Sequence, residues 1–151
     1  MRVTTWTEYS LIITLHLARR RGEGGSPTAA RELAESERLP GDYVEQILLR
    51  LRRAGIVSSV RGAKGGYRLA QEPDKISVFD VMTASERQTF QSNCDDHRID
   101  GLRCGPDMSC TIRPIWTELQ NRIDGFLRSV TLADMLQSEA AVQELVTLGG
   151  S

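Results

Sequence analysis

The chain has 151 residues, of which 40% are hydrophobic and 26% charged, and its formal net charge is −1. These values are typical of a globular domain, and no run approaches the roughly 20 apolar residues of a membrane span, so we expect a cytoplasmic protein with no membrane contact. Three cysteines without an apolar leader argue against a disulfide framework, and two histidines without a nucleophile motif argue against an enzyme.

Three helices are predicted in the first third of the chain. The first spans about residues 7–21, and its expected buried face carries Tyr9, Ile13, His16 and Leu17. The glycines of residues 22–25 end it, and a shorter helix is expected to start at Ser26 or Thr28. A third helix is predicted over about residues 42–54, because its apolar residues recur at i, i+3, i+4 and i+7 as Val44, Ile47, Leu48 and Leu51.

A β-hairpin is predicted directly after these helices. Two short β-prone stretches, residues 56–60 and 67–69, flank the glycine-rich turn 61–66. Three helices followed by a hairpin predict a winged helix, so the expected fold class is mainly α with a small β-wing. We assign residues 1–72 to a winged helix-turn-helix DNA-binding domain.

The sequence beyond Pro73 predicts a different kind of region. A short helix near residues 76–81 leads into a polar, cysteine-bearing loop over 83–110, and a long helix follows over about 112–129. The long helix carries an apolar stripe of Ile115, Trp116, Leu119, Ile123 and Phe126. Little sequence remains to cover this stripe, so we predict that it forms a twofold homodimer interface, with packing on its own domain as the alternative.

The rest of the organisation follows from this prediction. Residues 73–136 are assigned to the cysteine loop and the dimerisation helix, and they include a capped helix start at Thr131 to Asp134. Residues 137–151 are assigned to a C-terminal tail that begins as a weak helix.

Basic residues are concentrated in one segment. Residues 43–70 contain six arginines and lysines against one acid, a net +5 that leaves −6 for the rest of the chain. The candidate DNA-binding residues are Tyr43, Gln46, Arg50 and Arg53 on the third helix and Arg61 and Lys64 in the hairpin. A helix fits the major groove and a basic hairpin beside it reaches phosphates or the minor groove, so we predict binding to double-stranded DNA. The alternative is a solvated charged face.

Glycines and cysteines add two further predictions. The glycines at 62, 65 and 66 are expected to let the hairpin backbone approach DNA closely. Cys94, Cys104 and Cys110, spaced C-x9-C-x5-C in a loop too polar to bury them, can converge on a metal. Direct thiol oxidation, zinc completed by His97, and a small metalloenzyme at the same site are the alternatives.

Residues 1–8, the segment 43–67, the three cysteines and Thr131-Leu-Ala-Asp134 together resemble the dimeric winged-helix iron-sulfur transcriptional regulators of the IscR and NsrR type. The likeness covers about residues 1–136 and is most specific in the wing segment. It implies a homodimeric regulator, expected to be a repressor, that binds a palindromic operator. Its iron-sulfur cluster, 2Fe-2S or 4Fe-4S, would sense redox state, nitric oxide or cluster supply.

The resemblance also implies roles for individual residues. Those that it carries over are the cluster ligands Cys94, Cys104 and Cys110, the base-reading Glu45 and Gln46, and Arg61 in the minor groove. Arg113 stands where the IscR type has a histidine ligand, whereas Glu8 stands where the NsrR type has a ligating aspartate. Glu8 is therefore the expected fourth ligand, ahead of His97, His16 and the loop aspartates.

Overall fold

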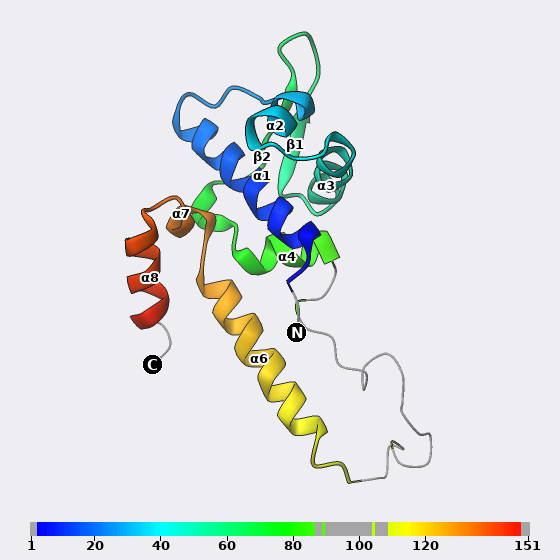
Figure 1. Ribbon diagram of the computed structural model, residues 1–151, viewed down its shortest axis with the longest axis vertical. Coiled ribbons are helices and arrows are strands. Elements are labelled where there is room, and N and C mark those ends of the chain that lie inside the picture. Colours follow the sequence, from blue (N-terminus) through cyan, green and yellow to red (C-terminus); the bar gives the residue numbers. More distant parts are fainter. Residues whose placement is uncertain (1–2, 87–88, 90–103, 105–108, 149–151) are drawn as a thin grey trace.

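The computed structural model describes residues 3–86, 89, 104 and 109–148, which form a mainly helical body with one long projecting helix (Figure 1). Its first elements are α1 (Thr5–Gly22), α2 (Ala30–Glu37), α3 (Gly41–Arg53), β1 (Val57–Val60) and β2 (Gly66–Leu69). They are followed by the 3-10 turn η1 (Pro73–Lys75), α4 (Val78–Glu86), α6 (Arg113–Ser129), α7 (Leu132–Met135) and α8 (Glu139–Leu148). The predicted fold class, mainly α with a small β-wing, is confirmed.

One buried apolar cluster holds the body together. The stripe predicted on α3 is fully buried and packs with Ile13 and Leu17 of α1. Other members of the cluster are Leu33, Ile56, Val57, Leu69, Ile76, Val81 and Leu132. Because the last three follow the wing in the sequence, α4 and α7 extend the core of the winged helix. The predicted boundary at residues 72–73 thus falls within one packed core.

α1 begins slightly earlier than predicted and buries a more polar face. Of the four predicted residues, Ile13 and Leu17 are buried, whereas Tyr9 and His16 are half-buried. Small polar side chains complete the buried face. The hydroxyl of Thr14, for example, donates to the main-chain oxygen one turn earlier at 2.9 Å, so its burial leaves no unmet donor.

α2 starts at Ala30, later than either predicted residue. Thr28 instead forms an isolated bridge with the wing, in which its N–H donates to the Tyr67 oxygen at 2.9 Å and the Tyr67 N–H donates back at 2.8 Å. This pairing holds the chain before α2 in an extended conformation, so the helix begins only after it. Leu33 is the fully buried residue of this helix, and Ala34 beside it is half-buried.

The wing is an antiparallel hairpin, as the sequence predicts, and Val60 pairs with Gly66, which the prediction placed in the turn. Two of its glycines are required by the fold of the hairpin itself. A Cβ at Gly65 would lie 2.1 Å from the Val60 carbonyl oxygen, and a Cβ at Gly66 would lie 2.4 Å from the backbone of Thr28. Close packing within the chain therefore requires glycine at these two positions, and the close approach to DNA stays a prediction.

Gly65→Ala is expected to destabilise the protein by at least about 2 kcal/mol, because backbone atoms of the hairpin must move to admit the methyl group. Chemical denaturation monitored by circular dichroism measures this loss. Gly22→Ala is the matched control, since a Cβ there has no atom within 4 Å and the variant should be at least as stable as the parent chain. Equal stability of the two variants would contradict this reason for Gly65.

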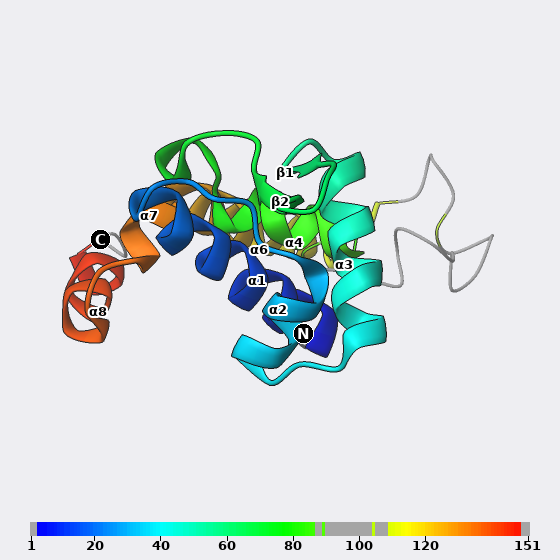
Figure 2. The same ribbon diagram turned by 90° about the horizontal axis from the view of Figure 1, so that it is seen from above.

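The elements after the wing differ from prediction at one boundary. We expected the loop to begin at Thr83, but α4 continues to Glu86, and the Thr83 hydroxyl donates to the Phe79 main-chain oxygen at 2.8 Å within the helix. α6 agrees with the predicted long helix to within a residue. α7 begins with a capping box between Thr131 and Asp134, which confirms the predicted capped start. Figure 2 shows α3 along one edge of the body and α8 at the opposite end.

None of the described helices is both long and apolar enough to cross a membrane. The two longest, α1 with 18 residues and α6 with 17, carry charged side chains at several positions. The apolar residues of α6 instead follow one face, as in helices that pack against protein.

Candidate nucleic-acid interface and cysteine site

The outward face of α3 presents polar side chains in the geometry of a groove-reading helix. Burial of the apolar stripe turns the opposite face to solvent. Residues exposed there are Asp42, Glu45, Gln46, Leu49, Arg52 and Arg53. Sequence reasoning missed Leu49, which is 39% exposed and can meet the methyl group of a thymine. The sequence could have indicated it, because Leu49 is an apolar residue that does not belong to the buried stripe of the helix.

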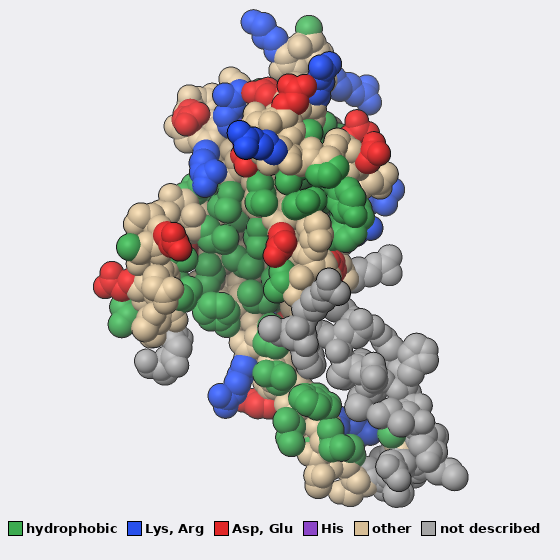
Figure 3. All heavy atoms as spheres, in the orientation of Figure 1, with side chains coloured by type: hydrophobic (Ala, Val, Ile, Leu, Met, Phe, Trp, Pro, Cys, Tyr) green, Lys and Arg blue, Asp and Glu red, His purple; other side chains and the backbone are tan. Residues whose placement is uncertain are grey.

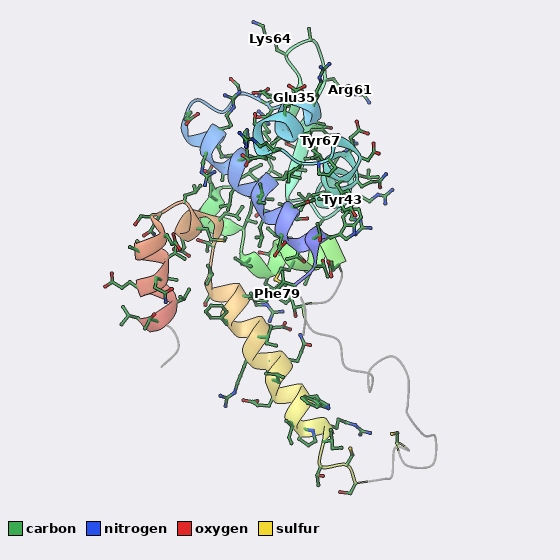
Figure 4. The ribbon with its side chains drawn as sticks, in the orientation of Figure 1. Glu35, Tyr43, Arg61, Lys64, Tyr67 and Phe79 are labelled. Atoms are coloured by element: carbon green, nitrogen blue, oxygen red, sulfur yellow. The ribbon has the colours of Figure 1, made fainter. Side chains whose placement is uncertain are left out.

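The wing adds cations beside α3. Arg61 and Lys64 are exposed, and Figure 4 shows both at the tip of the wing, projecting from the body. Within the described residues, neither of them nor Arg53 has an ion pair or a hydrogen-bond partner. Cations without internal partners are free to meet phosphates, so α3 and the wing together offer a helix and a basic hairpin to one duplex.

Two of the predicted DNA-binding residues also pack inside the chain, where α1, α3 and α4 meet. Arg50 Nη1 donates to the Ser85 main-chain oxygen at 2.6 Å, and its guanidinium lies 4.2 Å from the centre of the Trp6 ring. The Trp6 ring is also 4.8 Å from that of Tyr43, which makes an edge contact with Tyr9 at 5.7 Å. Arg50 thus connects α3 to the end of α4, and Tyr43 connects α3 to α1. Sequence reasoning missed this junction because its partners are far apart in the chain.

Two of the three cysteines lie in the described part of the chain. Cys104 and Cys110 are half-exposed free thiols, whereas Cys94 and His97 lie outside the described residues. The backbone N–H groups of Arg113 and Ile112, at the start of α6, donate to the Cys110 sulfur and lower the pKa of its thiol, and the Arg113 charge lowers it further. A lowered pKa favours the thiolate, the form that binds metals. Among the described residues, no three potential ligands are grouped around one point.

Glu8 lies in the first turn of α1, exposed and without an ion-pair partner among the described residues. The start of α1 lies beside α4, whereas α6 begins at its tip far from the body (Figure 1). Cys110 immediately precedes that tip. One chain therefore does not bring Glu8 and Cys110 together.

α6 leaves most of its predicted stripe exposed to solvent. No residue of this helix is buried, and green hydrophobic side chains gather along it in Figure 3. Ile115 is 62% exposed and Phe126 45%. The helix is joined to the body near its C-terminal end, where the Arg128 guanidinium lies 3.7 Å from the centre of the Phe79 ring.

Comparison with known proteins identifies this combination of helices, wing and projecting helix. Residues 3–138 match the model of the Rrf2 family, described as an iron-dependent transcriptional regulator. The chain belongs to the Rrf2 family. It is a helix-turn-helix transcriptional regulator that binds DNA, and its relatives are regulators and not enzymes, as the sequence predicted.

Named relatives of this Rrf2-family chain include two kinds of regulator. IscR of Photobacterium profundum is 33% identical over 145 residues, covering 96% of this chain and 80% of its own. The structure of CymR, the global cysteine regulator of B. subtilis, has a TM-score of 0.71 and 31% identity over 90% of this chain and 96% of its own. The T. potens IscR structure has a TM-score of 0.68 and 33% identity, with coverages of 90% and 86%.

Proposed function

We propose that this regulator is a homodimer that represses transcription and whose affinity for a palindromic operator depends on an iron-sulfur cluster held by its cysteine loop. The observation that carries the proposal is the hydrogen bond from Arg50 of the recognition helix to Ser85, one residue before the end of α4. The chain enters the cysteine-bearing segment directly after α4. A change in that segment therefore acts next to a residue that holds α3 in place.

The ligand set that we propose is Cys94, Cys104, Cys110 and Glu8. Thiolates are the common ligands of iron-sulfur clusters, and the lowered pKa of Cys110 fits this role. Glu8 is exposed and free to bind. Because the starts of α1 and α6 are apart in one chain, we propose that Glu8 is donated to the cluster of the other subunit. When bound, the cluster would supply a site that oxidants or nitric oxide attack.

The proposed DNA interface combines two surfaces. On α3, Glu45, Gln46 and Arg53 face the major groove together with the flanking Tyr43 and Arg50. On the wing, Lys64 contacts phosphate and Arg61 enters the minor groove. Twofold pairing through α6 places two such units at successive half-sites, which is why we expect a palindromic operator.

Direct thiol oxidation, or zinc completed by His97, is the second candidate for the signal. The lowered pKa of Cys110 supports it as well, because thiolates react with oxidants faster than thiols. Purification without oxygen separates the candidates. A coloured protein with iron and acid-labile sulfide supports the cluster, and a colourless protein whose DNA affinity changes on mild oxidation or zinc removal supports the second candidate.

Arg61→Ala should cost about 1–3 kcal/mol of preference for the cognate operator, because a guanidinium in a narrow minor groove reads its shape. Fluorescence anisotropy with cognate and random duplexes measures the difference. Equal losses on both duplexes would show that Arg61 contacts phosphate only. Unchanged binding to either would contradict the proposed role of the wing.

Arg53→Ala and Arg50→Ala should have different effects. Arg53 has no internal partner among the described residues, so its loss should weaken binding to every sequence and reduce the salt dependence by about one unit of slope. Loss of Arg50 also removes its contacts with Ser85 and Trp6, so Arg50→Ala should in addition lower the thermal stability. Anisotropy at several salt concentrations and a melting curve of each variant test this. Matching melting temperatures would contradict the proposed link between α3 and α4.

A further inference from the structure

A cleft of about 380 Å³ lies where the end of α1 meets the wing. Leu17 is an apolar residue of its lining, and residues Gly24–Ser26 and Tyr67 on β2 border it. Figure 4 shows Tyr67 below the tip of the wing. The volume is within the range of pockets that hold small ligands. This cleft is separate from the junction of Trp6 and Arg50 and from the cysteines.

Three arginines line the cleft, Arg20, Arg21 and Arg68. The charge and donors of Arg21 are already used within the chain. Its guanidinium pairs with Glu72 through two nitrogens and donates to the Leu69 main-chain oxygen at 3.0 Å. The other two retain unused donors. Arg68 is exposed and has no partner within the described residues.

Arg20 carries the more unusual of the unused donors. Its Nη2 reaches Glu32 at 3.2 Å, but its Nε is buried and has no acceptor. A buried N–H without an acceptor is costly, and structures usually satisfy it with protein, water or ligand. An anionic oxygen in the cleft would meet the free charge of Arg68 beside the Arg20 side chain, which is 39% exposed.

We propose that this cleft, which we call the arginine cleft, binds a phosphate group. A guanidinium directs several N–H donors at the oxygens of one phosphate, and two such groups with spare donors line the cleft. The phosphate belongs either to a small molecule or to the DNA backbone, and both sources present the same oxygens. Because Arg20 lies on α1 and Arg68 on β2, the bound phosphate ties the wing to the first helix.

The first test uses the full-length protein and inorganic phosphate, with sodium chloride at equal ionic strength as the reference. A saturable rise in melting temperature with phosphate is expected for the parent chain. Arg68→Gln and Arg20→Gln should each weaken the apparent affinity at least tenfold. Arg68 has no internal partner, so Arg68→Gln should fold normally. Arg31→Gln is the matched control, because that arginine is 89% exposed on α2 and outside the cleft, and it should respond as the parent does.

The second test distinguishes the two sources. If the phosphate is that of DNA, Arg68→Gln weakens binding to random duplex and reduces the salt slope, and inorganic phosphate competes with DNA. If the phosphate is that of a small molecule, the DNA-bound protein still takes up phosphate with its affinity unchanged, and Arg68→Gln binds random duplex as the parent does.

Either result supports the arginine cleft. No saturable response to phosphate together with an unchanged salt slope, or an equal loss in Arg31→Gln, would overturn it. These measurements need no cluster, so they can fail while the proposed function stands.

Discussion

Leu119→Glu is expected to convert the protein from a dimer to a monomer. Leu119 lies in the middle of the apolar stripe on α6, a helix with no buried residue in one chain. At a dry twofold interface each subunit would bury an unpaired carboxylate, which typically costs about 3–5 kcal/mol. Sedimentation velocity measures the change of mass. DNA affinity should fall as well, because the monomer loses the linkage between two half-sites.

Asn121→Glu provides the matched control for this experiment. It introduces the same charge on the same helix, but position 121 is exposed on the face opposite the stripe. This variant should remain dimeric and bind the operator as the parent chain does. A parent chain that sediments as a monomer, or a dimeric Leu119→Glu variant, would contradict the proposed interface.

The Cys104→Ala and Cys110→Ala variants are each expected to contain no iron and no acid-labile sulfide, even when they are purified without oxygen. Removal of one thiolate leaves too few ligands to retain a cluster. Iron analysis and the visible absorption spectrum measure the loss. Ser109→Ala is a matched control, since it alters an exposed neighbour of Cys110 that is not a proposed ligand. A Cys110→Ala protein that keeps its full iron content would contradict the ligand set.

Glu8→Ala should produce a different result from the cysteine variants. We expect folding and dimerisation to be intact, because Glu8 is exposed and makes no ion pair with the described residues. The absorption spectrum and the lifetime of the cluster should change. His97→Ala should have little effect. An unchanged spectrum in Glu8→Ala, or loss of iron in His97→Ala, would contradict Glu8 as the fourth ligand and indicate a ligand within the cysteine loop.

A mixed dimer tests whether Glu8 acts across the interface. One subunit carries Glu8→Ala and the other Cys110→Ala. If Glu8 is donated to the partner's cluster, both lesions affect the same cluster and one intact site per dimer remains. If Glu8 acts within its own chain, each cluster has one lesion and no intact site remains. The iron content and spectrum of the tagged and separated mixed dimer distinguish these outcomes.

Local patterns in the sequence were sufficient for most of the fold. The stripe of Val44, Ile47, Leu48 and Leu51 predicted both the helix and its buried face, because the period of a helix is repeated within a few residues. The glycine-rich turn predicted the wing, and the apolar residues of α6 predicted a helix that one chain leaves uncovered. Two helix boundaries were predicted wrongly. The start of α2 is set by the contact of Thr28 with the distant Tyr67, and α4 continues beyond the residue at which we expected the loop to begin.

Contacts between distant segments were decided by the tertiary structure alone. Nothing near Thr28 in the sequence shows that it pairs with Tyr67, and Arg50 looked like a solvent-facing cation although it contacts Ser85, 35 residues away. The arginine cleft likewise combines Arg20 with Arg68. The sequence by itself determined the helices and the wing, since these depend on neighbouring residues, whereas the cluster chemistry of the cysteines stays a prediction. Which side chains meet was decided by how α1, α3, α4 and the wing pack around one core, because packing brings together residues that no local period connects.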